Sequence, residues 1–516
     1  MVEAASELPP DVHPQVLFTH IQHKYNLPDV FVLDLWPISW EATMIISDPE
    51  VMKQFTQKRV LPKHPAIQYW IGHVIGPTSM ISSDGEPWKR SRVLFNTSFS
   101  NAHLMTLVGT IVDHTLIFCE KLEEFADRNE LFHLDNEATR LTIDVIGRVA
   151  LDDDFNAQRG EHELVTAFRQ SILWGPKASE INPFVNYSPL RLIMVRIFTH
   201  RMDRYLGKLL DQRIAAHTPS TADTQTRRKP AIELAIGEYY AQQQAKSSSG
   251  STWKTEDKAF KKQAIDNMKT FIFAGHDTTS STISYMYHQL SKHPDSLARV
   301  RAEHDTVFGS DLSQTVEKIK EQPHLLNQLP FTHAIIKETL RLYPPADPAR
   351  KGLKDIHIHQ TARTPALPTY PYFLMLNLHA LHRSPVYFPS PLTFSPARFL
   401  PAASRDDPSC PQGTTEIPPE AYRPFERGPR NCIGQELAVL EVKVVMVLTL
   451  RAFDVWADYD ADESADADKG VDAAKKGPKK DVVREVDGDR AYQALIATAK
   501  PAEGMPARVK RRVEGD

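Results

Sequence analysis

The chain has 516 residues, of which 41% are apolar and 24% charged, a composition that excludes collagen-like, coiled-coil and wholly disordered proteins. Its 61 Lys and Arg residues nearly balance 65 Asp and Glu residues, so the net charge of −4 provides no overall basic field for nucleic acid. The three cysteines are too few and too widely spaced for a disulfide framework, which favours a reducing compartment.

Residues 1–30 are polar enough to argue against a membrane anchor. Four acidic side chains lie among them, those of Glu3, Glu7, Asp11 and Asp29. A spanning helix needs about 20 consecutive apolar residues, and no such run is present here. We predict an N-terminal extension over residues 1–30 that makes at most peripheral contact with a membrane.

Helical periodicity dominates the rest of the chain, and strand-like stretches are few and short. In chain order, we predict strands at 31–36 and 43–47, helices at 100–126, 136–151, 161–174, 189–217, 255–290, 294–308 and 327–342, strands at 356–359 and 372–376, and a last helix at 434–451. At about 1.5 Å per residue the segment 255–290 is roughly 50 Å long, which predicts a central helix that crosses a whole domain.

Polar segments without periodicity are predicted to be loops, at 218–229, 242–255, 401–419 and 457–483. The last begins with an acidic run and ends with a basic one, which indicates a flexible, solvated insertion. No composition break separates independent domains. We therefore predict one domain over residues 31–516, mainly α with small β-sheets.

A cysteine lies in a glycine-bracketed loop in the last quarter of the chain. Residues 425–434 read F-E-R-G-P-R-N-C-I-G and lead directly into the predicted helix 434–451. An isolated cysteine such as Cys432 is more often a buried, inert thiol than a ligand. Here a helix N-terminus and Arg430 lie beside it in sequence, and both favour a thiolate, the form that a metal ion binds.

This loop resembles the haem-ligand loop of the cytochrome P450 monooxygenases. The pattern F-x-x-G-x-R-x-C-x-G is matched at all five defining positions, Phe425, Gly428, Arg430, Cys432 and Gly434. The resemblance implies a single P450-type fold with the long helix over a haem b, whose iron takes Cys432 as its axial ligand. It covers about residues 30–456 and is most like fungal members of secondary metabolism.

Glu338 and Arg341 lie three residues apart in a predicted helix, a spacing that places them on one face. Alone, such a pair is usually an exposed salt bridge of little energetic value. In the family that the chain resembles, this pair and a later arginine, here Arg398, form a buried cluster. The resemblance implies that the cluster holds the Cys432 loop in place, although Ala397 stands where the family usually has glutamate.

The predicted helix 255–290 contains A-G-H-D-T-T followed by further Ser and Thr residues. Glycine destabilises a helix interior by about 1 kcal/mol relative to alanine, and hydroxyl side chains compete for backbone hydrogen bonds. Close packing of this segment on a neighbouring helix is one explanation. The resemblance implies another, in which Gly275 leaves room over the haem, Thr278 contacts the bound oxygen and Asp277 relays protons.

The segment 84–92 predicts a helix start with Trp88 and Arg92 one turn apart. A solvated basic face is one interpretation. The resemblance implies instead that Trp88 and Arg92 bind the haem propionates together with Arg430, since guanidinium and indole N–H groups donate well to carboxylates. Residues 382–385, H-R-S-P, also match a stretch of the family, and no chemistry is assigned to them.

The resemblance implies a monooxygenase that takes electrons from NADPH through a cytochrome P450 reductase and inserts one atom of O₂ into a lipophilic small molecule. A haem-thiolate isomerase or dehydratase is an alternative, but the presence of Asp277 and Thr278 argues against it because that chemistry needs no proton relay. A degenerate, non-catalytic haem-binding protein is a second alternative, favoured if the short and atypical segment 349–372 spoils the pocket.

No motif identifies the substrate. The resemblance implies that residues within 60–83, 176–200 and 343–376 bind it, and their apolar content indicates only a lipophilic molecule. Fungal members of the family usually begin with a membrane-spanning helix, which residues 1–30 lack. The implied location is therefore the cytoplasm or the cytosolic face of the endoplasmic reticulum, without a spanning helix.

Overall fold

The computed structural model describes residues 2–35, 41–176, 188–216, 230–246, 253–360, 365–401, 407–461 and 483–512. The α-helices in this part of the chain are α1 (Val2–Ser6), α2 (Pro14–Lys24), α3 (Pro49–Lys53), α4 (Ala66–Ile75), α5 (Gly85–Asn96), α6 (Asn101–Thr106), α7 (Val108–Arg128), α8 (Leu134–Ile146), α9 (Glu163–Trp174), α11 (Pro189–Ala216), α12 (Ala231–Lys246), α13 (Trp253–Lys292), α14 (Pro294–Phe308), α15 (Thr315–Glu321), α16 (Pro330–Leu342), α17 (Leu378–Leu381) and α18 (Gln435–Thr449). Short 3-10 or π turns lie at Gln54–Lys58, Thr97–Phe99, Gly147–Leu151, Leu312–Gln314, Pro323–Gln328, Pro396–Phe399 and Ala502–Gly504.

The strands are short and form small sheets. They are β1 (Val30–Leu33), β2 (Thr43–Ile46), β3 (Phe132–His133), β4 (Ala349–Lys351), β5 (His357–Ile358), β6 (Leu367–Pro368), β7 (Phe373–Leu376), β8 (Phe453–Ala457), β9 (Gln493–Leu495), β10 (Ala499–Pro501) and β11 (Pro506–Arg511). The largest sheet has the order β1-β2-β7-β4, with β2 and β7 parallel and the other neighbours antiparallel. The predicted mainly α fold with small sheets is confirmed.

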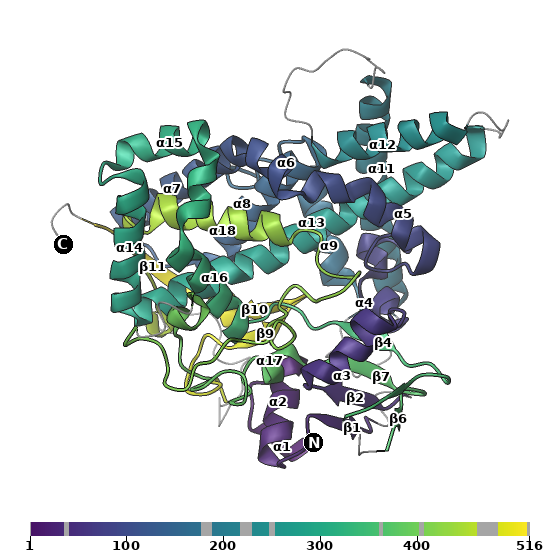
Figure 1. Cartoon of the computed structure of the whole chain (residues 1–516). Helices are drawn as coiled ribbons and strands as arrows, with labels where there is room; N and C mark the ends of the chain where they lie inside the picture. The colour runs from purple at the N-terminus through teal and green to yellow at the C-terminus, as the bar shows by residue number, and fades with distance from the viewer. Residues whose placement is uncertain are drawn as a thin grey trace.

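α13 is the central helix. It runs through the middle of the helical part and contacts α8, α16, α18 and β10, while the four-stranded sheet lies at the lower edge of the view (Figure 1). Its 40 residues give a length of about 60 Å, and apolar side chains along it, such as Ile272 and Met286, belong to the largest apolar core. α14 begins at Pro294, because proline lacks the N–H group that would continue α13.

Residues 2–30 pack into the rest of the chain and do not form a separate extension. Gln15 on α2 donates a hydrogen bond of 3.0 Å to the side chain of Gln493, almost the whole chain away. Phe18 lies in an apolar cluster with Phe31 of β1. The apolar face of α2 is buried against the sheet beside it. Residues 2–30 therefore belong to the same packed unit as the rest of the chain, and no domain boundary lies at residue 30.

The segment 349–372, atypical in sequence, forms β4, β5 and β6. β4 pairs with β7 and places Arg350 opposite Leu374 at the edge of the four-stranded sheet. Residues 361–364 lie outside the described residues, as do the predicted loop 218–229 and most of the predicted insertion 457–483. The flexibility of that insertion therefore stays a prediction.

Candidate active site

The Cys432 loop connects an irregular segment to α18. The Cys432 N–H donates to the carbonyl oxygen of Phe425 at 2.8 Å, and the Asn431 N–H donates to that of Gly428 at 3.0 Å. Gly428 has φ +87°, and a Cβ atom there would lie 2.5 Å from the carbonyl oxygen of Thr56. Glycine is therefore required at this turn, both for its backbone conformation and for the close approach.

The Cys432 thiol is exposed, whereas the other two cysteines are partly buried. Desolvation by the surrounding protein nevertheless raises its pKa, and the N–H groups of Gly434 and Gln435 and the charge of Arg92 oppose this only in part. The helix N-terminus thus favours the thiolate, as the sequence predicts, while desolvation favours the neutral thiol and is the larger effect. Coordination to a metal ion reverses this balance, since it deprotonates a thiol outright.

Two of the arginines predicted at the site surround this loop. Arg92 donates two bonds of 2.8 Å to Asn431, one to its carbonyl and one to its side-chain oxygen. Arg430 donates to the carbonyl oxygen of Ser83 at 2.9 Å, pairs with Asp84, and its guanidinium lies 4.4 Å from the ring centre of Trp88. Desolvation lowers the pKa of Arg430 to about 10.

Two further cations, missed by sequence reasoning, complete a basic cluster of Arg92, Arg430, Arg350 and Lys63. The Arg350 side chain is 1% exposed, its Nη2 atom lies 3.4 Å from Glu426, and its Nε atom has no hydrogen-bond partner among the described residues. Burial, assisted by the charges of Arg350 and Arg430, lowers the pKa of Lys63 to about 7. No local motif marks either residue: Lys63 lies in a loop and Arg350 in the short strand β4.

Glu338, Arg341 and Arg398 meet in the core, each with a side chain that is 0% exposed. The Glu338 carboxylate accepts bonds from Arg341 at 2.7 and 2.9 Å, from Arg398 at 3.0 Å and from the Ser395 N–H at 2.8 Å. The carboxylate is thus fully hydrogen-bonded, which is what makes buried charge tolerable. We call these three side chains the Glu338 cluster.

Hydrogen bonds connect the Glu338 cluster to the Cys432 loop. Arg341 donates to the carbonyl oxygen of His382 at 2.8 Å, and the His382 ring accepts a bond of 3.1 Å from the Arg423 N–H. The Arg423 guanidinium pairs with Glu426 and donates to the Thr56 hydroxyl at 2.9 Å. Because Glu426 lies inside the loop, the cluster is connected to the loop through His382 and Arg423.

Gly275 on α13 lies against α8. A Cβ atom at this position would lie 2.8 Å from Cγ1 of Ile146. The structure thus gives the glycine a packing reason, the close approach of two helices. Room over a haem, which the resemblance implies, stays a prediction.

Thr278 lines a cavity together with Phe425 of the Cys432 loop and Val439 of α18. Its hydroxyl donates to the Ala274 carbonyl oxygen at 2.8 Å, the hydrogen bond that a threonine in a helix commonly makes to the carbonyl group four residues earlier. Thr278 therefore lies on the side of α13 that faces the loop.

Asp277 lies in a second buried ion cluster, which sequence reasoning missed. Its carboxylate accepts a bond of 2.5 Å from the Thr498 hydroxyl and lies 3.3 Å from Lys500 Nζ, which also contacts Asp135 at 2.9 Å and Ser280 at 2.6 Å. Burial opposes ionisation of Asp277, but Lys500 above all outweighs it, and the pKa of Asp277 is lowered. We call Asp135, Asp277 and Lys500 the Lys500 cluster.

A sequence model of the cytochrome P450 family matches residues 6–480. The cytochrome P450 monooxygenase acrF of Aspergillus aculeatus is 38% identical to this chain over 97% of the chain and 98% of its own length, and polC of Polytolypa hystricis is 33% identical over 97% and 85%. The crystal structure of the cytochrome P450 CYP102L1 aligns with a TM-score of 0.72 at 19% identity, covering 97% of this chain and 99% of that one.

Fold and site therefore define a haem-thiolate enzyme. The chain belongs to the cytochrome P450 family, and it is a monooxygenase.

The residues around Cys432 fit a haem. The accessible thiol is a suitable iron ligand, and the three guanidinium groups of the basic cluster, with the partly protonated Lys63 beside them, meet only the carboxylates of Asp84 and Glu426, the second of which also pairs with Arg423. The excess positive charge matches the two propionates that the group carries. A haem held by a cysteine thiolate supplies the activation of O₂.

Proposed function

We propose that this protein is a haem b monooxygenase of fungal secondary metabolism that hydroxylates or otherwise oxygenates a lipophilic small molecule. Two electrons from NADPH, delivered by a cytochrome P450 reductase, and two protons reduce one oxygen atom of O₂ to water, and the other atom enters the substrate. The observation that carries the proposal is the accessible Cys432 thiol, in a glycine-bracketed loop joined to the Glu338 cluster. The similarity to fungal monooxygenases supports the biological setting.

In this proposal Cys432 is the axial iron ligand, and Trp88, Arg92 and Arg430 hold the propionates. Gly428 and Gly434 give the loop its shape. A Cβ atom at Gly434 would lie 3.9 Å from the Cys432 sulfur, so even a small side chain there reaches the thiol.

Two residues of α13, Thr278 and Asp277, are assigned to proton delivery. Thr278 lines the cavity beside Phe425, and its hydroxyl passes a proton toward the reacting oxygen once it releases its bond to the Ala274 carbonyl oxygen. Asp277 is ionised and connected through Lys500 to the Ser280 hydroxyl, so these polar groups form a path for resupply through the apolar core.

We propose that the enzyme works in the cytoplasm or at the cytosolic face of the endoplasmic reticulum. Within the residues described, no helix combines the length and apolarity needed to cross a bilayer. A membrane surface there would place the enzyme beside its reductase and beside lipophilic substrates.

The proposal is tested by expressing the chain with a fungal P450 reductase and with its genomic neighbours, and by profiling products with mass spectrometry under ¹⁸O₂. Incorporation of one labelled atom, dependent on NADPH and reductase, is the expected result. A product that forms without O₂ would overturn the monooxygenase assignment in favour of isomerisation or dehydration.

A further inference from the structure

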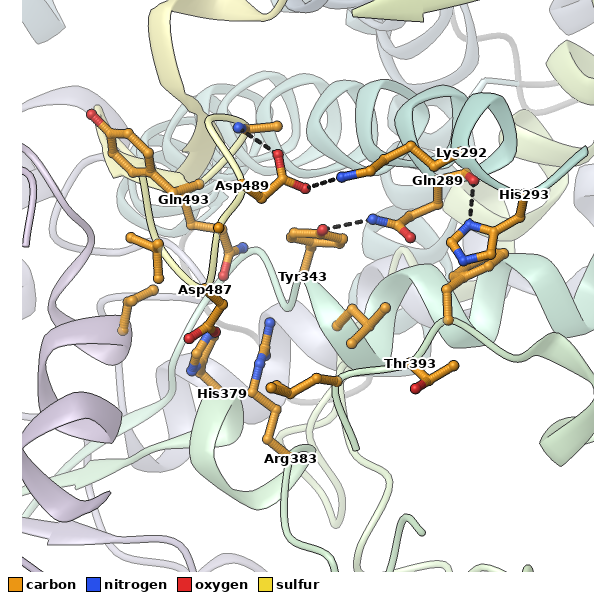
Figure 2. Close-up of a pocket in the computed structure, with 18 residues that line it drawn as sticks. Gln289, Lys292, His293, Tyr343, His379, Arg383, Thr393, Asp487, Asp489 and Gln493 are labelled. Atoms are coloured by element: carbon orange, nitrogen blue, oxygen red, sulfur yellow. Dashed lines mark hydrogen bonds and ion pairs between the residues drawn. The ribbon is translucent and has the colours of Figure 1, made fainter. Parts of the chain in front are cut away.

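A second pocket lies apart from the Cys432 site. It has a volume of about 370 Å³ and lies near the C-terminal end of α13, beside the end of α16, the segment that follows α17 and the loop before β9 (Figure 2). It shares no lining residue with the cavity at Thr278. Its volume falls in the range of small-molecule sites. We call it the Arg383 pocket, after the arginine of the H-R-S-P stretch to which no chemistry was assigned.

Arg383 is a buried cation, two of whose guanidinium nitrogens have no hydrogen-bond partner among the described residues. Its side chain is 8% exposed and points into the pocket toward Tyr343 (Figure 2), and its Nε and Nη1 atoms have no hydrogen-bond partner among the described residues. Burial lowers its pKa to about 10, so it stays charged at neutral pH. The Asp487 charge opposes the lowering of the Arg383 pKa, but no ion pair with a carboxylate is formed among the described residues, whereas Arg341 and Arg398 are both paired with Glu338.

The other polar groups of the pocket are largely satisfied within the protein. Lys292 donates to Asp489 at 2.9 Å, and the His293 ring lies 2.7 Å from the carbonyl oxygen of Gln289. Gln289 donates to the Tyr343 hydroxyl at 2.7 Å, which leaves the proton of that hydroxyl available to an acceptor in the pocket. Arg383 and the Tyr343 O–H group are therefore two donors that face the same space.

We propose that the Arg383 pocket binds a small organic monocarboxylate with an apolar body. A carboxylate matches the two-pronged geometry of a guanidinium and can accept from Tyr343 as well. The apolar part of the lining, which includes Leu342, Leu392 and Phe394, suits a hydrocarbon or aromatic body. A dianion such as phosphate is disfavoured, because the carboxylates of Asp487 and Asp489 also line the pocket.

The test is calorimetric titration of the haem-loaded protein with phenylacetate and with phenylacetamide, its neutral isostere. Phenylacetate should bind about tenfold more tightly, as a charge-assisted hydrogen bond implies, and the Soret band should not move because this pocket shares no lining residue with the cavity at Thr278. Arg383→Gln should abolish the difference between the two probes, and Arg383→Lys should keep part of it. Equal binding of both probes, or carboxylate binding that persists in Arg383→Gln, overturns the proposal.

A second variant keeps the test decisive if Arg383→Gln does not fold. Asp487 is exposed at the rim of the pocket, so Asp487→Asn leaves the core intact while it removes a competing negative charge. Phenylacetate should then bind about threefold or more tightly, since one nearby like charge has been removed. Glu86→Gln, an exposed carboxylate of α5, is the matched control and should change nothing. Unchanged affinity in Asp487→Asn contradicts the assignment. The proposal does not depend on the substrate or reaction proposed above.

Discussion

The Glu338 cluster and the Lys500 cluster, both buried, differ in how their partners are arranged along the chain. In the Glu338 cluster one carboxylate serves two arginines, and one of those pairs lies within a single helix turn. In the Lys500 cluster one lysine on β10 serves Asp135 on α8 and Asp277 on α13, both far away in sequence. The first cluster is connected to the Cys432 loop, and the second fixes the central helix to the C-terminal strands. The spacing of Glu338 and Arg341 in one motif therefore predicts the first cluster, whereas no motif spacing predicts the second.

The Glu338 cluster contributes to haem binding only if Cys432, to whose loop it is connected, is the iron ligand. Cys432→Ala should lose the red-shifted Soret band of the reduced, CO-bound protein completely, because no thiolate remains on the iron. Absorption spectroscopy of the reduced protein under CO measures this. Cys410→Ala is the matched control and should keep the band. A thiolate-type spectrum in Cys432→Ala would contradict the assignment.

Breaking the Glu338 cluster should have the largest effect on stability. Glu338→Ala leaves two arginines buried without a counter-charge and should lower the free energy of unfolding by about 3 to 5 kcal/mol, with little haem-loaded protein obtained. Chemical denaturation and haem content measure both effects.

The control is Glu86→Ala, because Glu86 and Lys89 form a pair with the same spacing as Glu338 and Arg341 but with side chains 78% and 63% exposed. It should change the free energy of unfolding by less than about 1 kcal/mol. Equal effects of the two substitutions would show that burial does not distinguish the pairs.

Breaking the Lys500 cluster should give a loss that depends on pH. Lys500→Met leaves the carboxylates of Asp135 and Asp277 buried without their cation, so the pKa of each should rise above its value in the unfolded chain. The destabilisation, about 3 kcal/mol at neutral pH, should shrink as the pH falls toward about 5, because the folded variant then binds more protons than the unfolded chain. In the wild type the lowered pKa of Asp277 has the opposite sign, and its contribution is lost only in strong acid.

Unfolding curves of Lys500→Met and wild type at several pH values measure this difference. Lys89→Met, at an exposed site, is the control and should give a small effect that is independent of pH. A destabilisation by Lys500→Met that stays constant from pH 5 to pH 8 would mean that Asp277 does not depend on Lys500 for its charge.

The smallest effect on stability is expected at Thr278, where the change should appear in coupling. Thr278→Ala removes one hydrogen bond within α13, of about 1 kcal/mol, and also a hydroxyl on a residue that lines the cavity. It should keep the spectral shift on substrate binding and the consumption of NADPH, while a larger share of O₂ appears as hydrogen peroxide.

Thr270→Ala is the matched control, because Thr270 donates the same kind of bond within α13, to the Asp266 carbonyl oxygen at 2.9 Å, and does not line the cavity. Peroxide and product assays of both variants separate a local packing effect from proton delivery. Wild-type coupling in Thr278→Ala would remove the proposed role of this residue.

The sequence determined features that depend on near neighbours in the chain. Helical periodicity predicted α13, α14 and α18 to within a few residues, because apolar spacing and proline act locally. The glycines of the Cys432 loop and the spacing of Glu338 and Arg341 are local in the same sense. The resemblance supplied Arg398, and the structure places it against Glu338.

Tertiary structure decided which distant groups become partners. The pairing of Asp277 with Lys500, the approach of Arg350 to Glu426 and the unpaired state of Arg383 each depend on strands and loops that meet only in the folded core. The raised pKa of Cys432 has the same origin, because desolvation depends on all the protein atoms around a group and not on its sequence neighbours. Burial and long-range pairing depend on how distant segments pack together, so the spacing of residues along the chain does not predict them.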